Sequence, residues 1–466
     1  MNSHRQFHDP QWKHAIDAMD KLSLKLPWAK RLRHPYYFSF KRNFKNGVKL
    51  HFALIAENAI FWLQHFFKIF KRKSNSTNSN GSSILFLLDD NTAYFNALIP
   101  LIKKLQQEKV AFECFVPKSK LQKVLQKLQQ ENIAVFNIIN EDFFLPKNYF
   151  KSFINADLKS KIETTKFSFS ICKKKRFMLL YCQQYALQQH LYGKHINQFL
   201  QTKKYLLGAG DHWFWDSLFY FEASKTNCQS IILQHGLMGE FNYPMHSKKY
   251  WVWGKHDYEV MLNDFKANAN ELEIIGSAHF DTFAQKLNIT QKTFERKSIT
   301  FFTQPYFKYE ALGTGLYAEV VNWFYELNTV AQKHNKQLLI KWHQLDNESL
   351  YPKFSDEIKT SKNNLAEVLA ETCIGITVDS AIMFEAASAD VPMIQLHHLE
   401  FERFIDFSKD NLTMKASSAK ELHDLTEKIL SNENELTQMN LKTQNSISNF
   451  LANKNEVLNE MLKRLK

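Results

Sequence analysis

The chain has 466 residues, 44% of them hydrophobic, which is enough for two ordinary domains with sizeable cores and an additional segment. Its net charge is +13, yet residues 1–73 hold 15 basic residues against four acidic ones, so the remainder is nearly neutral. A basic segment indicates an anionic partner surface, and the lack of a recognisable nucleic-acid-binding module favours a membrane over nucleic acid. The five cysteines form no Cys-x-x-Cys pair, which argues against disulfide and zinc frameworks and fits a reducing cytoplasm.

Residues 1–73 are predicted to form a basic, amphipathic N-terminal extension without the apolar run of a cleavable signal peptide. Within it, residues 51–71 have a helical pattern rich in aromatic residues, which polar and charged residues interrupt too often for a membrane-spanning helix. Two interpretations remain open. The segment is either an interfacial helix on an anionic leaflet or an ordinary amphipathic helix packed on the protein body. The Ser- and Asn-rich stretch 74–83 predicts a flexible linker, which would leave the body folded without residues 1–73.

From residue 84 onwards, short apolar runs alternate with helical patterns. Strands are predicted at 83–88, 110–116 and 133–139, with helices at 93–107 and 118–130, which is the start of a Rossmann-like βαβαβ arrangement. No Gly-x-Gly-x-x-Gly follows the first strand, so a standard dinucleotide site is not expected. Asp89 and Asp90 are interpreted as carboxylates of a strand-end turn rather than as metal ligands.

Later strands are predicted in two groups, with a changeover near residues 285–297. The first group comprises 205–207, 230–234, 249–253 and 273–275; the second comprises 298–303, 337–341, 374–378 and 391–396. The sequence therefore predicts an α/β protein with two facing Rossmann-like domains. Their predicted bounds are 84–290 and 291–410, with C-terminal helices over 411–466.

The stretch 374–396 is the most informative part of the chain. An apolar strand is followed by the polar turn Asp379-Ser380, a helix and another strand, which makes a βαβ unit. Such a turn lies at the carboxyl end of a parallel strand and at the amino end of a helix, where an anion is favoured. Ser380 can donate to a phosphate oxygen, and Glu385 can accept from a ribose or sugar hydroxyl. The alternative is a generic βαβ crossover in which Ser380 only caps the helix.

This stretch resembles the donor-binding half of bacterial GT-B glycosyltransferases and of CDP-glycerol glycerophosphotransferase-like enzymes, which build capsules, lipopolysaccharide, teichoic acids and other surface polysaccharides. In those enzymes a Ser-containing turn and a Phe-Glu-Ala-type helix hold the nucleotide diphosphate, which implies donor contacts from Asp379, Ser380 and Glu385. The resemblance spans roughly residues 231–396. It implies a GT-B fold with an N-terminal acceptor domain and a C-terminal nucleotide-donor domain.

His235 is the first candidate catalytic residue. It follows the apolar run 231–233 and Gln234, and it precedes Gly236, whose lack of a side chain permits close approach of a substrate. The near-neutral pKa of a histidine suits proton abstraction from an acceptor hydroxyl. The resemblance implies the same role, because the surface-polymer enzymes carry a similar His-Gly after an apolar strand. The alternative is a structural histidine bonded to a neighbouring carbonyl.

His343 is the second candidate. Lys341-Trp342-His343 ends a predicted strand and is similar to the Lys-x-His-Pro of the same families, although Gln344 replaces the proline. The resemblance implies that His343, with Lys341, contacts the donor phosphates. Gln304 follows strand 298–303, in a loop that lies under the nucleotide in GT-B folds, so it is expected to bond a base or a phosphate. For Gln304 the alternative is a simple turn before a proline.

Weaker candidates lie elsewhere. Asp211 and His212, near the end of strand 205–207, are candidate acid/base groups. Asp281 lies in a stretch that resembles the Gly-x-Pro-x-x-Asp segment closing the N-terminal domain of these enzymes, and it is interpreted mainly as part of a hinge. His397 and His398 lack a third ligand at useful spacing, so no metal is expected there.

These features favour a glycosyltransferase or polyol-phosphate transferase of bacterial surface polysaccharide biosynthesis. It would use a nucleotide-activated donor and a saccharide or lipid-linked acceptor, without a metal or cofactor, in the cytoplasm or peripherally on the inner membrane face. A UDP-sugar 2-epimerase-like enzyme would share the fold, but it needs acidic acid/base groups that the sequence does not identify. A non-enzymatic membrane-surface scaffold is disfavoured because His235, His343 and Ser380 all follow predicted strands.

Overall fold

The structure is a computed structural model. It describes residues 17–20, 23–24, 27–32, 82–134, 137–146, 148–171, 176–211, 214–238, 242–290, 296–304, 306, 316–343, 346–354, 357–378, 380–397 and 405–466. The predicted interfacial helix at 51–71 lies outside the described residues, as does all but the last two residues of the linker 74–83.

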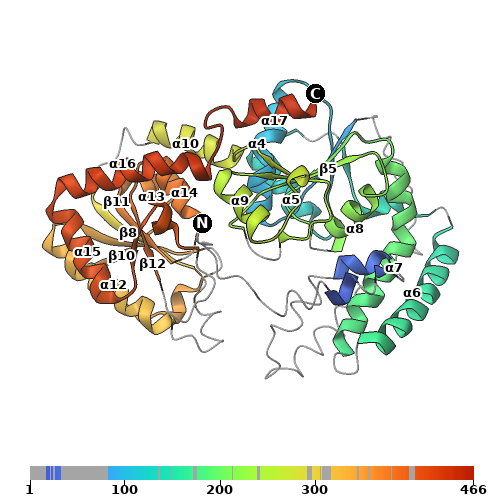
Figure 1. The fold of residues 1–466 in the computed structure, drawn as a ribbon, viewed down its shortest axis with the longest axis horizontal. Helices are drawn as coiled ribbons and strands as arrows, with labels where there is room; N and C mark the ends of the chain where they lie inside the picture. The colour runs from blue at the N-terminus through green and yellow to red at the C-terminus, as the bar shows by residue number, and fades with distance from the viewer. Residues whose placement is uncertain are drawn as a thin grey trace. The chain divides into compact units, whose positions relative to one another are not determined.

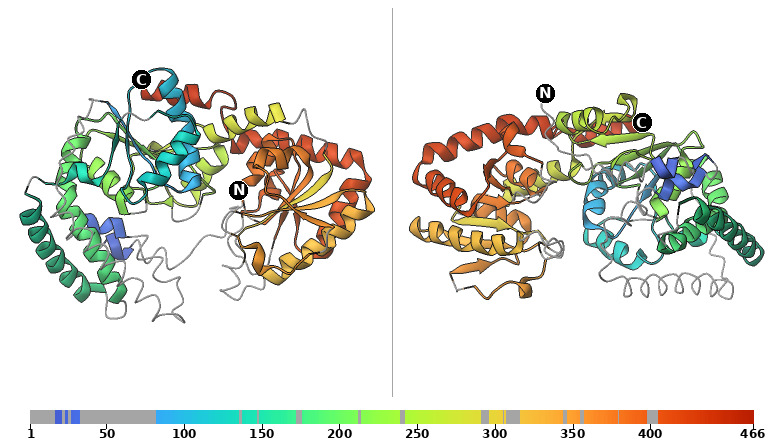
Figure 2. Two further views of the ribbon diagram at one scale, coloured as in Figure 1. Left: turned by 180° about the vertical axis from the view of Figure 1, so that it is seen from behind. Right: turned by 60° about the horizontal axis from the view of Figure 1, so that its bottom comes forward.

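The described chain divides into two compact units, each built around one β-sheet (Figure 1). The N-terminal unit takes in the described residues between 8 and 252, together with 265–273 and 461–466. The C-terminal unit takes in 253–264 and the described residues of 274–460. Helices cover both faces of each sheet (Figure 2). The predicted α/β fold with two Rossmann-like domains is confirmed.

The sheet of the N-terminal unit has seven strands in the order β3-β2-β1-β4-β5-β6-β7. All neighbouring strands from β3 to β6 in this order are parallel. The strands are β1 (Ile84–Leu87), β2 (Glu113–Phe115), β3 (Ile138–Ile139), β4 (Tyr205–Gly208), β5 (Gln229–Leu233), β6 (Lys249–Val252) and β7 (Leu272–Ile274). Its helices include α4 (Thr92–Gln107), α5 (Leu121–Gln130), α6 (Tyr149–Ile171), α7 (Arg176–Leu200) and α8 (Phe214–Ala223).

The sheet of the C-terminal unit has six parallel strands in the order β10-β9-β8-β11-β12-β13. The strands are β8 (Ser298–Phe302), β9 (Gln337–Lys341), β10 (Ile358–Thr360), β11 (Thr372–Thr377), β12 (Met393–Leu396) and β13 (Met414–Ala416). Its helices include α9 (Lys255–Asn263), α10 (Ala278–Thr290), α12 (Leu316–Lys333), α13 (Leu365–Glu371), α14 (Ile382–Ser388), α15 (Ala419–Ser431) and α16 (Glu433–Phe450). The last helix, α17 (Val457–Leu465), begins in this unit and ends in the other.

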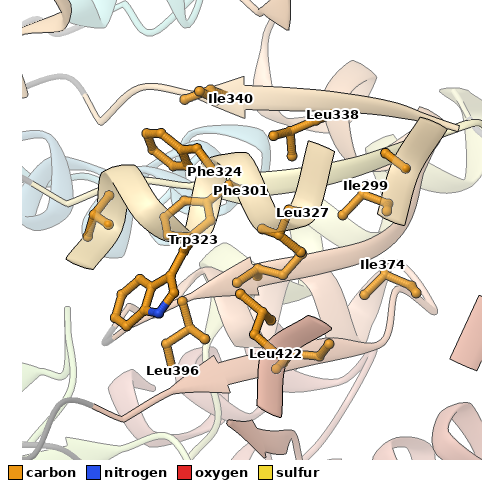
Figure 3. Packing of buried hydrophobic residues seen from close by; sticks show 14 of the residues in the cluster. Ile299, Phe301, Trp323, Phe324, Leu327, Leu338, Ile340, Ile374, Leu396 and Leu422 are labelled. Carbon is orange, nitrogen blue, oxygen red and sulfur yellow. The ribbon is translucent and has the colours of Figure 1, made fainter. Parts of the chain in front are cut away.

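The core of the C-terminal unit lies between α12 and the sheet (Figure 3). Trp323, Phe324 and Leu327 of α12 are fully buried, and Phe324 packs edge-to-face on Phe301 of β8 with ring centroids 4.8 Å apart. The burial of each such side chain contributes about 1.5–3 kcal/mol relative to exposure. This packing fixes β8 and its neighbours, and with them the loops that follow these strands.

Each sheet has one point at which the chain reverses its direction of travel across the sheet. In the first sheet the chain runs outward from β1 to β3 and returns to β4 on the other side of β1. In the second it runs from β8 to β10 and returns to β11 on the other side of β8. Open α/β sheets bind their ligands in the crevice outside the carboxyl ends of the strands at such a switch point. The switch points are therefore the positions at which to look for a site.

A short N-terminal helix, η1 (Pro27–Leu32), belongs to the packed N-terminal unit. Arg31, which is 1% exposed, donates to the Oγ of Ser217 over 3.2 Å, to the carbonyl of Phe214 over 2.9 Å and to the side chain of Gln188. Its guanidinium also lies over the ring of Tyr185, 4.9 Å from the centroid, and burial lowers the pKa of Arg31 to about 9. A folded body after removal of residues 1–73 stays a prediction, and that deletion would also remove Arg31 from between α7 and α8.

Candidate functional site

The switch point of the second sheet carries two of the predicted donor-binding residues. Gln304 follows β8, and Ser380 follows β11, directly on either side of the point where the strand order reverses. Both side chains are half-buried. Asp379, between β11 and Ser380, lies outside the described residues. The topology thus brings Gln304 and Ser380 to the same edge of the sheet, where a nucleotide would be expected.

Ser380 forms a short turn into α14. Its Oγ accepts a hydrogen bond from the backbone N–H of Ile382 over 3.3 Å, while Ala381, the residue before the helix, makes no side-chain cap. The hydroxyl proton of Ser380 donates to no group among the described residues, so it is available to a ligand oxygen. α14 has only seven residues, so we do not assign anion binding to its N-terminus. The side chains at the strand ends are the groups expected to bind an anion.

His343 reaches the same edge from β9, the neighbour of β8. Its backbone N–H donates to the Oγ1 of Thr303 over 2.9 Å, which ties the loop after β9 to the residue just before Gln304. The imidazole has an acidic neighbour in Asp346, whose carboxylate accepts from the hydroxyl of Tyr351 over 3.1 Å. Burial raises the pKa of Asp346, while hydrogen bonds from Thr303 and Tyr351 and the charge of His343 oppose that rise. The ends of three adjacent strands thus supply His343, Gln304 and Ser380.

Lys341 is engaged elsewhere. Its ammonium donates to the backbone carbonyl of Asn363, and burial lowers the pKa of Lys341 while Glu367 raises it. To contact a donor phosphate, as the sequence predicts, Lys341 would have to leave Asn363. Its role as a phosphate ligand stays a prediction.

Glu385 lies in the first turn of α14 and is 9% exposed. Its Oε1 is 3.4 Å from the Nε2 of His279 on α10, a residue that the sequence placed only in a hinge. No donor among the described residues reaches the buried Oε2. A buried carboxylate oxygen without a donor is unfavourable, and a hydroxyl donor from a ligand would relieve that cost.

Asp281 has a structural partner. Its Oδ2 accepts from the backbone N–H of Val457 over 3.4 Å at the start of α17, and burial raises the pKa of Asp281. Nearby, Gly276 has a φ of +99°, and a Cβ there would come within 2.3 Å of the carbonyl oxygen of Ala452. Gly254 is equally confined, with the backbone of Phe450 2.4 Å from an added Cβ. These contacts hold the chain around 254 and 276–281 against the C-terminal segment, which serves the fold.

In the N-terminal unit, His235 follows β5 and is half-buried. Its ring packs edge-on against Tyr94, with ring centroids 4.2 Å apart. Tyr94 lies in the first turns of α4, the helix that follows β1, so the imidazole lies on the switch-point side of this sheet. A Cβ added to Gly236 would meet no atom of the described residues within 4 Å, which leaves the approach beside His235 open on their side.

Several carboxylates lie at the switch point of the first sheet, and the sequence identified only some of them as candidates. Asp211, directly after β4 and 1% exposed, accepts from the backbone N–H of His246 over 2.6 Å. Asp216, in the first turn of α8, is the residue that the sequence missed. Burial raises the pKa of Asp216 well above its ordinary value, and the charges of Asp89 and Asp211 raise it further, while Lys120 opposes them. The three carboxylates thus converge where β1 and β4 end, whereas His212 lies outside the described residues.

The two candidate metal positions have other partners. Asp89 and Asp90 both contact the ammonium of Lys120 on the turn before α5, as expected of a strand-end turn. His397 lies 3.6 Å from Asp406, and burial lowers the pKa of His397. His398 is outside the described residues, and within the part of the chain that is described no group of three or more His, Cys, Asp or Glu is placed to hold a metal ion.

No protein-family model matches the chain, and no curated protein does so either. Solved structures do match. A UDP-N-acetylglucosamine 2-epimerase aligns with a TM-score of 0.53 and 11% identity, over 82% of this chain and 94% of that one. A putative UDP-N-acetylglucosamine 2-epimerase from Listeria monocytogenes aligns with a TM-score of 0.52 and 11% identity, over 82% and 95%. The UDP-GlcNAc 2-epimerase from Neisseria meningitidis, bound to UDP-GlcNAc, aligns with a TM-score of 0.51 and 11% identity, over 82% and 99%.

At this level of identity the likeness shows the fold. The chain is a two-domain α/β protein of the GT-B type, as the resemblance in its sequence implied. Among the described helices, none has the length and hydropathy needed to cross a membrane.

Proposed function

We propose that the protein is a nucleotide-sugar enzyme, and specifically a transferase that moves a glycosyl or polyol-phosphate group from a nucleotide-activated donor. The observation that carries the proposal is the convergence of His343, Gln304 and Ser380 at the ends of β9, β8 and β11, around the switch point of the second sheet. Solved structures of the same fold include one bound to UDP-GlcNAc, which supports a nucleotide-activated donor.

The donor would lie against the C-terminal unit. Ser380 would donate to a diphosphate oxygen and Gln304 would bond the base or a phosphate. His343 would add positive charge beside the nucleotide as it departs. Glu385 would accept from a hydroxyl of the ribose or the sugar. These groups can offset the charge of the leaving group, so the proposed chemistry needs no metal ion.

The acceptor would be activated from the N-terminal unit. His235 would remove the proton of the acceptor hydroxyl as its oxygen attacks the anomeric carbon, or the phosphorus in the case of a polyol phosphate. The bond to the nucleotide breaks in the same step, and the nucleotide leaves with the bonding electrons. An acceptor that is a saccharide or a lipid-linked sugar of capsule or lipopolysaccharide synthesis fits this role, with the enzyme on the cytoplasmic side.

A second candidate function, a UDP-sugar 2-epimerase-like reaction, gains support from the acidic group in the N-terminal unit. Inversion at C2 needs one group to remove a proton and another to return one. Asp216, with its raised pKa, suits the acid, and Asp211 suits the base. The sequence alone had not supplied such a pair.

One assay separates the two reactions. The purified chain is incubated in D2O with CDP-, UDP- or GDP-activated donors, with and without a lipid-linked acceptor, and followed by NMR. The transferase releases the nucleotide only when the acceptor is present and leaves the sugar C2 protonated. Deuterium at C2 without acceptor would establish the epimerase instead, and no change in any donor would refute both.

The donor site makes a specific prediction for Ser380→Ala. The loss of one hydrogen bond to a charged phosphate should weaken nucleotide binding by about 1–3 kcal/mol, with little effect on folding because Ser380 is half-buried in a turn. Titration calorimetry with nucleoside diphosphates measures this change. Ser388→Ala, the same substitution at the other end of α14, is the matched control and should bind like the unmodified protein. Equal affinities in both variants would show that Ser380 does not touch the nucleotide.

A further inference from the structure

The N-terminal unit carries an apolar stripe on its surface that the proposed reaction does not use. α6 lies along the outer side of α7 (Figure 1). Phe153, Ala156 and Ser160 of α6 are buried. On another face of the helix, Ile154, Leu158 and Ile162 are exposed by 48%, 58% and 49%.

The spacing of these three residues is i, i+4, i+8, so they line one side of the helix. They make up three of the eight large hydrophobic residues that the described chain exposes. Single exposed hydrophobic residues need no explanation, but a contiguous stripe usually marks a contact with another apolar phase or surface. We call Ile154, Leu158 and Ile162 the α6 stripe.

Basic residues accompany the α6 stripe. Lys151, Lys159 and Lys161 of α6 are exposed. Lys161 pairs with Asp157 over 2.7 Å and Glu163 pairs with His190 over 2.9 Å, so Lys151 and Lys159 carry the charge beside the stripe.

We propose that the α6 stripe docks on an anionic lipid surface. An apolar helix face flanked by lysines is the pattern of helices that lie in the interface of a membrane. Each basic residue close to an anionic leaflet adds to the attraction within a Debye length of the surface. The stripe supplies the apolar contact, and the exposed lysines of α6 supply the charge.

Charge also argues against other occupants of the stripe. A second copy of the same face would bring the lysines of two α6 helices together, and like charges repel. Residues 33–73, the part of the basic extension that follows η1, hold nine basic residues and one acidic residue, so they would be repelled as well. Both segments are instead complementary to the same anionic surface. The proposal does not depend on the reaction that the protein catalyses.

Vesicle flotation with the full chain tests the proposal. The vesicles consist of phosphatidylcholine alone or of phosphatidylcholine and phosphatidylglycerol in equal parts. The unmodified protein should float with the anionic vesicles only and should be released partly by high salt. Leu158→Gln should lower the partition coefficient roughly tenfold, and Ile154→Gln/Leu158→Gln/Ile162→Gln roughly a hundredfold.

The control is Leu441→Gln on α16, which replaces a leucine of similar exposure, 51%, in the C-terminal unit. It should float like the unmodified protein, and all variants should keep the same thermal unfolding because the replaced side chains are exposed. Sedimentation velocity is run in parallel. The proposal is overturned if the unmodified protein stays in solution or if the triple variant floats equally well. It is also overturned if the unmodified protein is a dimer that the triple variant abolishes, since the stripe would then bind a second copy.

Discussion

Replacement of His235 by alanine is expected to lower turnover by roughly two to four orders of magnitude, the usual contribution of a general base. His235 follows β5 on the switch-point side of the first sheet, and Gly236 leaves the approach beside it open. Nucleotide affinity should change little, because the proposed nucleotide contacts come from β8, β9 and β11 of the other unit. Steady-state turnover and calorimetry on the same preparation separate the two effects.

The matched control is His423→Ala. His423 lies on α15 and pairs with Glu326 over 3.0 Å, away from either switch-point group, so turnover should stay normal. Near-normal turnover in His235→Ala would exclude the base. A large drop in its unfolding temperature would point to a structural histidine, which packs on the ring of Tyr94.

Replacement of Arg31 by alanine is expected to cost about 3–5 kcal/mol of stability, the range typical of breaking a buried polar network. The guanidinium is 1% exposed and donates to Ser217, Phe214 and Gln188, and the substitution would remove a donor from each of these groups. Urea unfolding of the N-terminal unit measures the loss. Hydrogen exchange in α7 and α8 should rise as well.

Lys30→Ala provides the comparison. Lys30 is the neighbouring residue in the same short helix and is exposed, so its loss should change stability by no more than about 0.5 kcal/mol. If Arg31→Ala unfolds at the same urea concentration as Lys30→Ala, then Pro27–Leu32 contributes nothing to the unit, and residues 1–73 form a separable extension after all.

The strands that flank both switch points could be predicted from the sequence, because buried parallel strands read as continuous apolar runs. β8, β9, β11 and β12 lie within one or two residues of the predicted ranges. β10 and β13 could not be predicted. Each has three residues, and with Lys359 and Lys415 they lack an apolar run. They are the edge strands of the sheet, so pairing with a neighbour rather than burial defines them.

The same rule explains which site residues could be predicted. His343, Gln304 and Ser380 each follow a strand closely in the sequence. Because the carboxyl ends of parallel strands share one edge of a sheet, this is enough to predict that the three residues lie at the same edge. Their partners come from packing in space. Asp346 is recognisable only through Thr303 and Tyr351, which surround its carboxylate.

The surroundings of His279 and Asp216 likewise could not be predicted from the sequence. His279 meets Glu385 across 106 residues of sequence, from a helix that the pattern assigned to a hinge. Asp216 acquires its raised pKa from burial and from Asp89 and Asp211, which no local pattern encodes. Sequence periodicity places residues along the chain, whereas the protonation of an acid depends on the groups that the fold brings around it.

The most direct test of a donor site at the switch point of the second sheet is a crystal structure of the chain with a bound nucleoside diphosphate, with UDP and CDP tried in turn. Difference density for the diphosphate is expected at the carboxyl ends of β8 and β11, with oxygens within hydrogen-bond distance of Ser380 and His343 and with Gln304 beside the base or a phosphate. A hydroxyl of the ribose should meet the Oε2 of Glu385. Density that lies elsewhere on the chain, or none at saturating nucleotide, would contradict a donor site at the switch point of the second sheet.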